Sequence, residues 1–361
     1  MNIALLYPTR EKHSTGVRNL AKGTIIETLK ADTQNHYYFC DDTYFDRDVH
    51  PFSNVKWGGY PEECARYDFL CYCKKIDLVH SYWNTFDLMQ ADCTKLITIH
   101  DLIPLIHPEW HTMHDYFDTV VRRTAERADL VLTNSEYTKK DVVEYYHIAP
   151  EKVIPIYPGL LHSLDFSYTD KAVLDKFGIR HDYIMSVSTI EPRKNLRGLI
   201  NGFIEFKRSH PASQLQLVLV GGIGWDRTFE ADIEQLDQYR DSIVLTGFVE
   251  DRELSSLYCN ALAVGYVSFY EGFGLPILEA LAAGKAVISS DTTSMPEVGG
   301  DAVCYCDPYQ VESIAAAIER VVGDESYRRQ LEALAPQQAA KFSYAKAAAE
   351  TIAVYNKFGG R

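Results

Sequence analysis

Residues 271–279 read EGFGLPILE, and this stretch places a carboxylate at each end of a glycine-rich segment. Gly272 and Gly274 permit backbone angles and close approaches that residues with side chains resist. The main-chain amides of Gly272, Phe273 and Gly274 can therefore face a ligand directly. Glu271 and Glu279 would then accept hydrogen bonds from two parts of one polyhydroxylated ligand, without a metal ion.

The second half of the stretch predicts a short helix. Pro276 suits its first position and Gly284 suits its end. The positive end of this helix would point at the glycine-rich loop and favour an anionic or hydroxyl-rich ligand. Glycine-flanked turns from strand to helix also recur in α/β proteins without a ligand, so a buried helix with two solvated acids is the structural alternative.

The whole chain alternates strand-like apolar runs with amphipathic helical runs, which is typical of parallel sheets covered by helices on both faces. With 361 residues and 46% hydrophobic residues, two cores are expected. The strand candidates of the first half are NIALLYP, HYYFC, IDLVHSYW, KLITIH, DLVLTN and VIPIYP, and those of the second half are YIMSVS, LQLVLVG, SIVLTGF, LAVGYVS, KAVISS and AVCYC. Proline, glycine and polar residues interrupt the pattern over residues 158–168, so the domains are predicted at 1–163 and 164–342.

The charge balance excludes some partners. A formal net charge of −14 and a sequence pI near 5.3 argue against nucleic acid, because phosphate binding depends on Lys and Arg. No run reaches the roughly 20 apolar residues that cross a bilayer, and no signal peptide precedes the first strand. We therefore expect a soluble, cytoplasmic protein with at most peripheral contact at the inner face of the membrane. Arg122, Arg123 and Arg127 could make that contact, although a solvated helix face is the simpler interpretation.

The eight cysteines lack the spacing of a metal site. Two pairs have C-x-C spacing inside strand- or helix-like segments, whereas zinc sites usually show two C-x2-C pairs. We interpret them as buried apolar thiols and expect no metal and no cofactor. The cysteines are Cys40, Cys64, Cys71, Cys73, Cys93, Cys259, Cys304 and Cys306.

Several ordered motifs resemble those of glycosyltransferase family 4, whose members are retaining enzymes of the two-domain GT-B type. The E-x7-E spacing of Glu271 and Glu279 inside EGFGLPILEALAAGKAVI resembles the family signature. The similarity spans nearly the whole chain. The other matching motifs are STGVRNLAKG, TIHDLIPLIHPEW, ADLVLTNSEYTKKDV, SVSTIEPRKNLRGLINGF, LVLVGG, VLTGFVEDRELSSLY and DTTSMPEVGGDAV.

The resemblance implies a specific domain organisation. Two Rossmann-like, doubly wound parallel-sheet domains would face a central cleft. Residues 1–163 would bind the acceptor and residues 164–342 the nucleotide sugar. The C-terminal helix within residues 343–361 would return to the N-terminal domain. Ser343 is its candidate N-cap, and its expected apolar face comprises Ala345, Ala348, Ala349, Ile352 and Tyr355.

Arg193 and Lys194 follow the strand candidate YIMSVS in a turn that contains Pro192. Ligands of open α/β sheets bind at the carboxyl ends of strands, which is where this turn lies. Cations at the start of the helix that begins near Asn195 oppose its dipole, so they are better explained by an anionic ligand than by the helix. Together they could stabilise the charge that develops on a departing diphosphate. A basic turn without a ligand is the alternative.

The resemblance gives roles to further residues. Glu279 would hold ribose hydroxyls, Glu271 would contact hydroxyls of the transferred sugar, and His100 would lie beside the donor sugar and its diphosphate. Glu271, His100, Arg193 and Lys194 are thus the candidate catalytic residues. The remaining candidate donor-binding residues are Gly16, Gly221, Gly222, Thr246, Gly247, Phe248, Val249, Gly272, Phe273, Gly274 and Leu275.

The predicted reaction is the transfer of a sugar from a nucleotide diphosphate donor to a hydroxyl of a glycan or lipid-linked glycan, with retention at the anomeric carbon. HDLIPLIHPEW resembles mannosyl- and rhamnosyl-transferring members that build surface polysaccharides, which favours guanosine diphosphate mannose over uridine or thymidine diphosphate sugars. Rival interpretations are an epimerase or phosphorylase of the same fold and a non-catalytic sugar-nucleotide binding module. The missing G-x-G-x-x-G fingerprint argues against a dehydrogenase.

Overall fold

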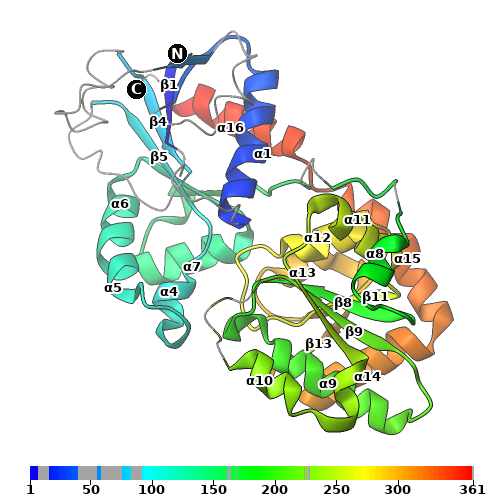
Figure 1. Ribbon diagram of the computed structural model, residues 1–361. Coiled ribbons are helices and arrows are strands. Elements are labelled where there is room, and N and C mark those ends of the chain that lie inside the picture. Colours follow the sequence, from blue (N-terminus) through cyan, green and yellow to red (C-terminus); the bar gives the residue numbers. More distant parts are fainter. Residues whose placement is uncertain are drawn as a thin grey trace. The chain divides into compact units, whose positions relative to one another are not determined.

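The computed structural model describes residues 1–6, 16–39, 55–57, 75–82, 92–160, 164–167, 169–222, 224, 226 and 228–359. The chain divides into two compact units. The first comprises Met1–Leu161 together with Phe342–Arg361, and the second comprises His162–Lys341 (Figure 1). None of the helices described is long and apolar enough to span a membrane.

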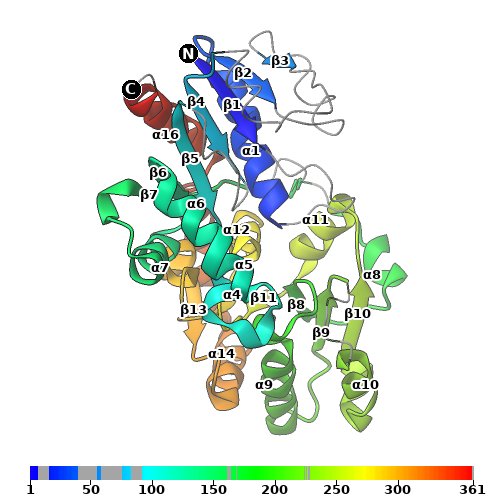
Figure 2. The same cartoon turned by 90° about the vertical axis from the view of Figure 1, so that its left-hand side faces the viewer.

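The first unit contains a parallel sheet in the order β3-β2-β1-β4-β5-β6-β7 (Figure 2). The six strands predicted from the first half of the sequence are confirmed, and β3 is an additional one. The strands are β1 (Asn2–Leu6), β2 (His36–Phe39), β3 (Val55–Trp57), β4 (Leu78–Ser81), β5 (Thr94–Ile99), β6 (Leu130–Thr133) and β7 (Val153–Pro155). The strand order changes direction between β1 and β4, as in a doubly wound sheet.

The helices of the first unit are α1 (Gly16–Ala31), α4 (Ile103–Ile106), α5 (His114–Tyr116), α6 (Arg122–Arg127), α7 (Glu136–Tyr146) and α16 (Tyr344–Phe358). Short 3₁₀ turns cover Pro108–Trp110 and Pro150–Lys152, and a π-helical turn covers Phe117–Val121. Ser135 is the N-cap of α7, since its hydroxyl accepts a hydrogen bond from the Thr138 amide.

The C-terminal helix α16 returns to the first unit, as predicted, and packs against α1 (Figure 1). Its N-cap is Ser343, whose hydroxyl accepts a hydrogen bond from the Lys346 amide. A Cβ atom at Gly23 of α1 would lie 2.3 Å from the Tyr344 ring, so this contact needs glycine. The predicted buried face was partly wrong. Ala345 and Ala349 are exposed, whereas the helix buries Tyr344, Ala347, Ala348, Thr351, Val354 and Tyr355.

The second unit contains a parallel sheet in the order β10-β9-β8-β11-β12-β13. All six of its strands were predicted from the sequence. They are β8 (Tyr183–Val187), β9 (Gln216–Val220), β10 (Ile243–Gly247), β11 (Ala263–Tyr266), β12 (Ala286–Ser290) and β13 (Val303–Cys306). The order changes direction between β8 and β11, and the loops after these two strands therefore define the position where a ligand is expected.

Helices cover both faces of this sheet. They are α8 (Ala172–Lys176), α9 (Leu196–Ser209), α10 (Phe229–Glu234), α11 (Asp251–Asn260), α12 (Leu275–Ala282), α13 (Met295–Gly299), α14 (Val311–Gly323) and α15 (Glu325–Ala339), with 3₁₀ turns at Pro192–Lys194, Asp237–Ser242 and Gly300–Ala302. Helix α9 packs against α14, and α12 packs against α15. A Cβ atom at Gly202 of α9 would lie 2.6 Å from Cγ2 of Ile314, so the glycine allows α14 to approach closely.

Candidate functional site

The candidate site of the second unit lies where the strand order changes direction. Arg193 and Lys194 belong to the 3₁₀ turn after β8, and Glu271 follows β11, which is the neighbour of β8 in the sheet. The amide of Phe269 donates a hydrogen bond of 2.9 Å to the carbonyl oxygen of Arg193, which joins the two loops. Residues separated by more than 70 positions in the sequence are thus brought together by the topology of the sheet.

Glu271 forms ion pairs with both cations. Its Oε2 atom lies 2.8 Å from Nη1 of Arg193, and its Oε1 atom lies 2.7 Å from Nζ of Lys194. Each cation also has a second partner. Nε of Arg193 lies 2.9 Å from Oε2 of Glu191, and Nζ of Lys194 donates a hydrogen bond of 2.9 Å to the Tyr266 hydroxyl. Glu191 and Glu271 are both buried. The result is a network of two cations and two carboxylates at the edge of the sheet.

The charges of this network are set by burial and by the neighbouring ions. Burial raises the pKa of Glu271, but the charges of Arg193 and Lys194 outweigh this effect and lower the pKa to about 2. The pKa of Lys194 is lowered by burial and by the charge of Arg193, against the opposing effect of Glu271. At neutral pH Glu271 is therefore a carboxylate whose two oxygens both face cations.

Asn195 fixes the turn that carries the cations. It is the N-cap of α9, in the left-handed region at φ 52°, and its side-chain oxygen accepts a hydrogen bond from the Gly198 amide. Its Nδ2 atom donates to the carbonyl oxygens of Val267 and Pro308, at 3.0 and 2.8 Å. Helix α9 thus begins where the sequence predicted. The two cations precede its N-terminus, where the helix dipole gives them no stabilisation.

Glu279 lies in the second turn of α12 and is buried. The Tyr258 hydroxyl donates a hydrogen bond of 2.6 Å to its Oε2 atom. Burial raises the pKa of Glu279 to about 7, although the bond from Tyr258 acts in the opposite direction. Helix α12 has no acidic residue in its first turn, so stabilisation of the helix start does not explain this carboxylate.

Of the two glycines in the glycine-rich loop, Gly274 has a positive φ and Gly272 does not. Gly274 is the N-cap of α12 at φ 105°, and Gly284 follows the helix at φ 69°. Leu275 is the first residue of α12, so Pro276 occupies the second position rather than the first. The Ser294 hydroxyl lies 2.9 Å from the carbonyl oxygens of both Glu271 and Phe273, and this contact holds the loop from one side.

Gly221 directly follows β9, and Gly247 is the last residue of the neighbouring strand β10. The Gly221 amide donates a hydrogen bond of 3.0 Å to the Gly247 carbonyl oxygen. Gly221 has a φ of 137°, and a Cβ atom there would lie 2.0 Å from the Ser188 carbonyl oxygen. Of the residues that follow, Phe248 is 75% exposed whereas Val249 is buried. These residues, with Gly222 and Thr246, occupy the same edge of the sheet as the cations.

His100 and Gly16 belong to the first unit. Gly16 is the first residue of α1, and His100 directly follows β5. His100 is buried, and its Nε2 atom lies 2.9 Å from the Tyr82 carbonyl oxygen. Burial lowers the pKa of His100, which keeps its imidazole neutral at pH 7.

The sequence interpretation missed three partners of the site. Tyr258 closes the quoted motif VLTGFVEDRELSSLY, and Glu191 lies two residues before Arg193, but neither was given a role. Tyr266, at the end of β11, was also missed. Proximity in the sequence could have identified Glu191. Tyr258 and Tyr266 required the packing of α11 and β11 against the site.

The cysteine prediction is confirmed for two residues. Cys304 and Cys306 are free and buried. Cys93 and Cys259 are free and only partly buried, because they lie outside the cores. The remaining four cysteines, Cys40, Cys64, Cys71 and Cys73, lie outside the described residues. Among the residues described, no group of three or more His, Cys, Asp or Glu side chains is arranged to hold a metal ion.

Comparisons with known proteins relate both units to one class of enzymes. Residues 175–338 match the family model of glycosyl transferases group 1, and residues 42–162 match that of glycosyltransferase family 4. The chain is 32% identical over 269 residues to O-antigen chain mannosyltransferase B of Escherichia coli, covering 72% of this chain and 69% of that protein. It is also 32% identical over 263 residues to serotype-specific mannosyltransferase WbdA of Escherichia coli. That match covers 69% of this chain and 32% of the relative.

A solved structure agrees with the fold. The crystal structure of Anabaena HepE in complex with UDP matches with a TM-score of 0.76, covering 99% of this chain and 100% of that one. The sequence identity is 16%, so this likeness concerns the fold alone.

Proposed function

Because the chain belongs to glycosyltransferase family 4, we propose that it transfers mannose from guanosine diphosphate mannose to a hydroxyl of a glycan or lipid-linked glycan acceptor, with retention at the anomeric carbon. Its two doubly wound sheets are those of the GT-B fold. The relatives named as an O-antigen chain mannosyltransferase and a serotype-specific mannosyltransferase support a role in surface polysaccharide synthesis and favour mannose as the transferred sugar. Uridine and thymidine diphosphate sugars are the alternative donors.

The observation that carries the proposal is the placement of Arg193 and Lys194 at the switch point of the second sheet. A glycosyl donor leaves behind a diphosphate whose negative charge grows as the bond to the sugar breaks. Preorganised cations stabilise this charge at no cost of reorganisation during the reaction. Lys194 donates to Tyr266 and Glu271 with two of its three N–H groups, so a third donor can reach a phosphate oxygen. No divalent metal is needed for this role.

The ion pairs of Glu271 support a binding role for this carboxylate rather than a nucleophilic one. Both of its oxygens face cations within 2.8 Å, and its pKa of about 2 makes it a weak base. A nucleophile for double displacement needs an available, activated oxygen. We therefore place Glu271 at the hydroxyls of the transferred sugar. The acceptor hydroxyl then attacks the anomeric carbon from the same face of the sugar from which the diphosphate departs. A phosphate oxygen takes the proton of the acceptor hydroxyl.

Glu279 is suited to bind the ribose of the donor. It is buried, and one of its oxygens already accepts a hydrogen bond from Tyr258. A carboxylate has about four acceptor sites, so it can receive two ribose hydroxyls as well. The main-chain groups after β9 and β10, from Gly221 and Gly222 to Val249, would then contact the base.

A panel of sugar nucleotides tests the proposal. Each nucleotide is first scored by thermal shift, because a ligand at about 100 times its dissociation constant stabilises the folded protein by about 2.7 kcal/mol. The best donor is then incubated with mannose-terminated acceptors, and the anomeric configuration of the product is determined by NMR. We expect binding of guanosine diphosphate mannose and an α-linked product. A β-linked product would refute retention, and a trapped glycosyl adduct on Glu271 would refute same-face attack.

The same panel separates the rival functions. A binding module would be stabilised by a sugar nucleotide but would release no nucleoside diphosphate with any acceptor. An epimerase would convert the donor itself in the absence of an acceptor. Either result would contradict mannosyl transfer.

A further inference from the structure

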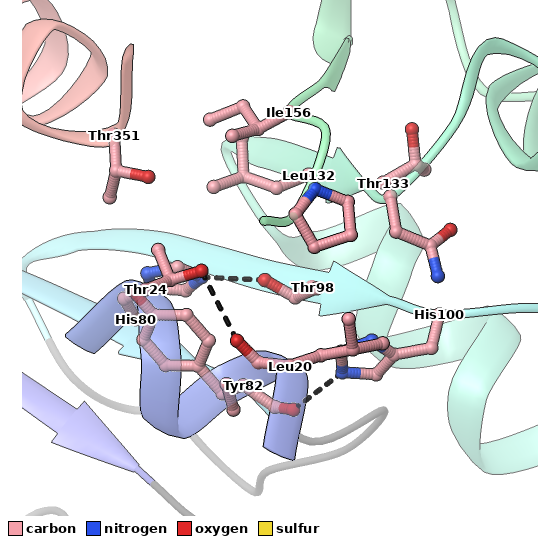
Figure 3. Close-up of a pocket in the computed structure, with 13 residues that line it drawn as sticks. Leu20, Thr24, His80, Tyr82, Thr98, His100, Leu132, Thr133, Ile156 and Thr351 are labelled. Atoms are coloured by element: carbon pink, nitrogen blue, oxygen red, sulfur yellow. Dashed lines mark hydrogen bonds between the residues drawn. The ribbon is translucent and has the colours of Figure 1, made fainter. Parts of the chain in front are cut away.

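The ring of His100 is held by the residue that follows the neighbouring strand β4. Its Nε2 atom lies 2.9 Å from the carbonyl oxygen of Tyr82, which can only accept, so Nε2 carries the proton (Figure 3). The amide of Tyr82 in turn donates a hydrogen bond of 2.9 Å to the carbonyl oxygen of Leu6, at the end of β1. The orientation of the His100 ring therefore depends on the position of Tyr82.

His80, in β4, is a fully buried polar residue with a partner for each ring nitrogen. Its Nε2 atom lies 2.8 Å from Oγ1 of Thr98 in β5 (Figure 3), and its Nδ1 atom lies 2.6 Å from the hydroxyl of Tyr355 in α16. The rings of His80 and Tyr82 pack together with their centroids 4.0 Å apart. Burial and the proximity of His100 lower the pKa of His80 to about 3, so its imidazole is neutral at pH 7.

Tyr355 connects these side chains to the C-terminal helix. Its hydroxyl contacts His80 and lies 3.3 Å from the hydroxyl of Tyr82, and the whole side chain is buried. Buried polar networks whose members are all satisfied rigidify a core and specify one arrangement of it. The Tyr355 network, defined as Tyr355, His80, Thr98 and Tyr82, therefore fixes α16 to β4 and β5 in one position.

The Tyr355 network reaches His100 by two routes. Tyr82 supplies the carbonyl oxygen that binds the His100 ring, and Thr98 lies in β5 two residues before His100. Both routes lead back to one hydroxyl group, that of Tyr355. Removing this hydroxyl group would therefore release both supports of His100 together.

A small cavity beside the Tyr355 network shows that packing alone does not hold these rings (Figure 3). Its volume is about 40 Å3, and a water molecule needs roughly 10–15 Å3 on this measure. His80, Tyr82, Thr98 and His100 all line it. Side-chain packing leaves room for the rings to move, so the polar contacts fix their positions.

We propose that Tyr355 is a positioning residue for glycosyl transfer, which sets the orientation of the His100 ring through His80, Thr98 and Tyr82. Side chains of a reactive site must be held within about 0.5 Å of the productive geometry by supporting contacts of this kind. The inference rests on the proposed function, because the orientation of His100 affects turnover only if a substrate meets it. It gives the C-terminal helix a part in the site of the first unit.

Steady-state kinetics of the Tyr355→Phe variant test the proposal. This change keeps the ring and removes only the hydroxyl group, and we expect kcat/KM to fall by about 2- to 10-fold. Thr98→Val removes the other partner of His80 and should have a similar effect. An unchanged kcat/KM in Tyr355→Phe would contradict the proposal.

The control is Thr94→Val, which removes a different hydrogen bond between β5 and α16. The Thr94 hydroxyl donates to the carbonyl oxygen of Phe358 at 3.0 Å, at the opposite end of β5 from His100. This variant weakens the docking of α16 without changing the Tyr355 network, and it should leave kcat/KM unchanged. An equal loss in Thr94→Val and Tyr355→Phe would show that only the docking of α16 matters, and the positioning role would be refuted.

A double-mutant cycle separates positioning from a general loss of stability. In the His100→Phe background, Tyr355→Phe should cause no further loss of kcat/KM, because the ring that it positions is absent. Losses that multiply in the double variant would show that Tyr355 acts independently of His100, which would overturn the proposal.

A measurement without turnover keeps the inference distinct from the proposed function, and it decides the question if His100→Phe is inactive. In ¹⁵N NMR of histidine-labelled protein, with His100→Phe for assignment, the ring resonances of His100 should shift in Tyr355→Phe and stay at their wild-type positions in Thr94→Val. Unchanged His100 resonances in Tyr355→Phe would refute the positioning role, even if the wild-type protein transfers mannose. Failure of every sugar nucleotide to react with the wild-type protein would count against the proposed function instead.

Discussion

Glu279→Gln should remove a dependence of stability on pH that originates in the buried carboxyl group. The pKa of Glu279 is raised to about 7 in the folded protein, from an ordinary value of 4.5, chiefly by burial. A carboxyl whose folded pKa is raised contributes stability that is fully present below pH 4.5 and is lost as the pH rises through about 7. At about 1.4 kcal/mol for each pH unit, this difference is worth about 3 kcal/mol. Glutamine is neutral at every pH and keeps a side-chain acceptor for Tyr258.

The assay compares unfolding free energies of the wild-type and Glu279→Gln proteins between about pH 4.5 and 8. Because two units can unfold separately, hydrogen exchange of β8 and β11 peptides is used to follow the second unit alone. From the low to the high end of this pH range, the unfolding free energy of the wild-type protein should fall by about 3 kcal/mol relative to that of the variant. The control is Glu205→Gln, a change at an exposed helical position. The difference in unfolding free energy between this variant and the wild-type protein should not change with pH. A flat difference for Glu279→Gln would refute the assignment of a raised pKa to this residue.

Two further outcomes follow from the geometry. Gly221→Ala should destabilise the second unit by more than about 2 kcal/mol, because its Cβ atom would lie 2.0 Å from the Ser188 carbonyl oxygen at a φ of 137°. The control is Gly222→Ala, whose Cβ atom would meet nothing within 4 Å. Equal unfolding midpoints for the two variants would contradict this account of Gly221. Sugar transfer should continue unchanged in EDTA, since Arg193 and Lys194 supply the positive charge; activity lost in EDTA and restored by Mg2+ or Mn2+ would show that a metal ion does so.

The sheets could be predicted from the sequence because their strands lie in apolar runs that alternate with helical segments. Twelve apolar runs predicted twelve of the observed strands. The strand β3 was missed because its three residues, VKW, include a lysine and are flanked in the sequence by polar residues and glycines, whereas the equally short β7 lies in the longer apolar run VIPIYP. The face of α16 was placed partly wrongly because alanines at 345, 347, 348 and 349 surround the helix and give no preference for one side. Tyr344 and Thr351 decide the face through contacts that the sequence does not reveal.

The candidate site was predictable in its parts but not in its connections. The glycine-rich loop, the two cations and Glu271 stand out as local patterns. The ion pairs between them depend on β8 and β11 being neighbours, which follows from the strand order and not from any local signal. The raised pKa of Glu279 likewise depends on its burial, whose effect exceeds the opposing effect of the hydrogen bond from Tyr258 of α11.

The role of the two cations can be measured most directly through kcat for mannosyl transfer. Lys194→Met and Arg193→Ala each remove one cation from the site. The control is Arg208→Ala, which removes an exposed cation from α9, the helix that follows the turn. Circular dichroism confirms that each variant folds. By analogy with other preorganised anion sites, kcat should fall by about 10²- to 10³-fold for each site variant and remain unchanged for the control. A kcat close to the wild-type value in both folded site variants would contradict the claim that these cations stabilise the departing diphosphate.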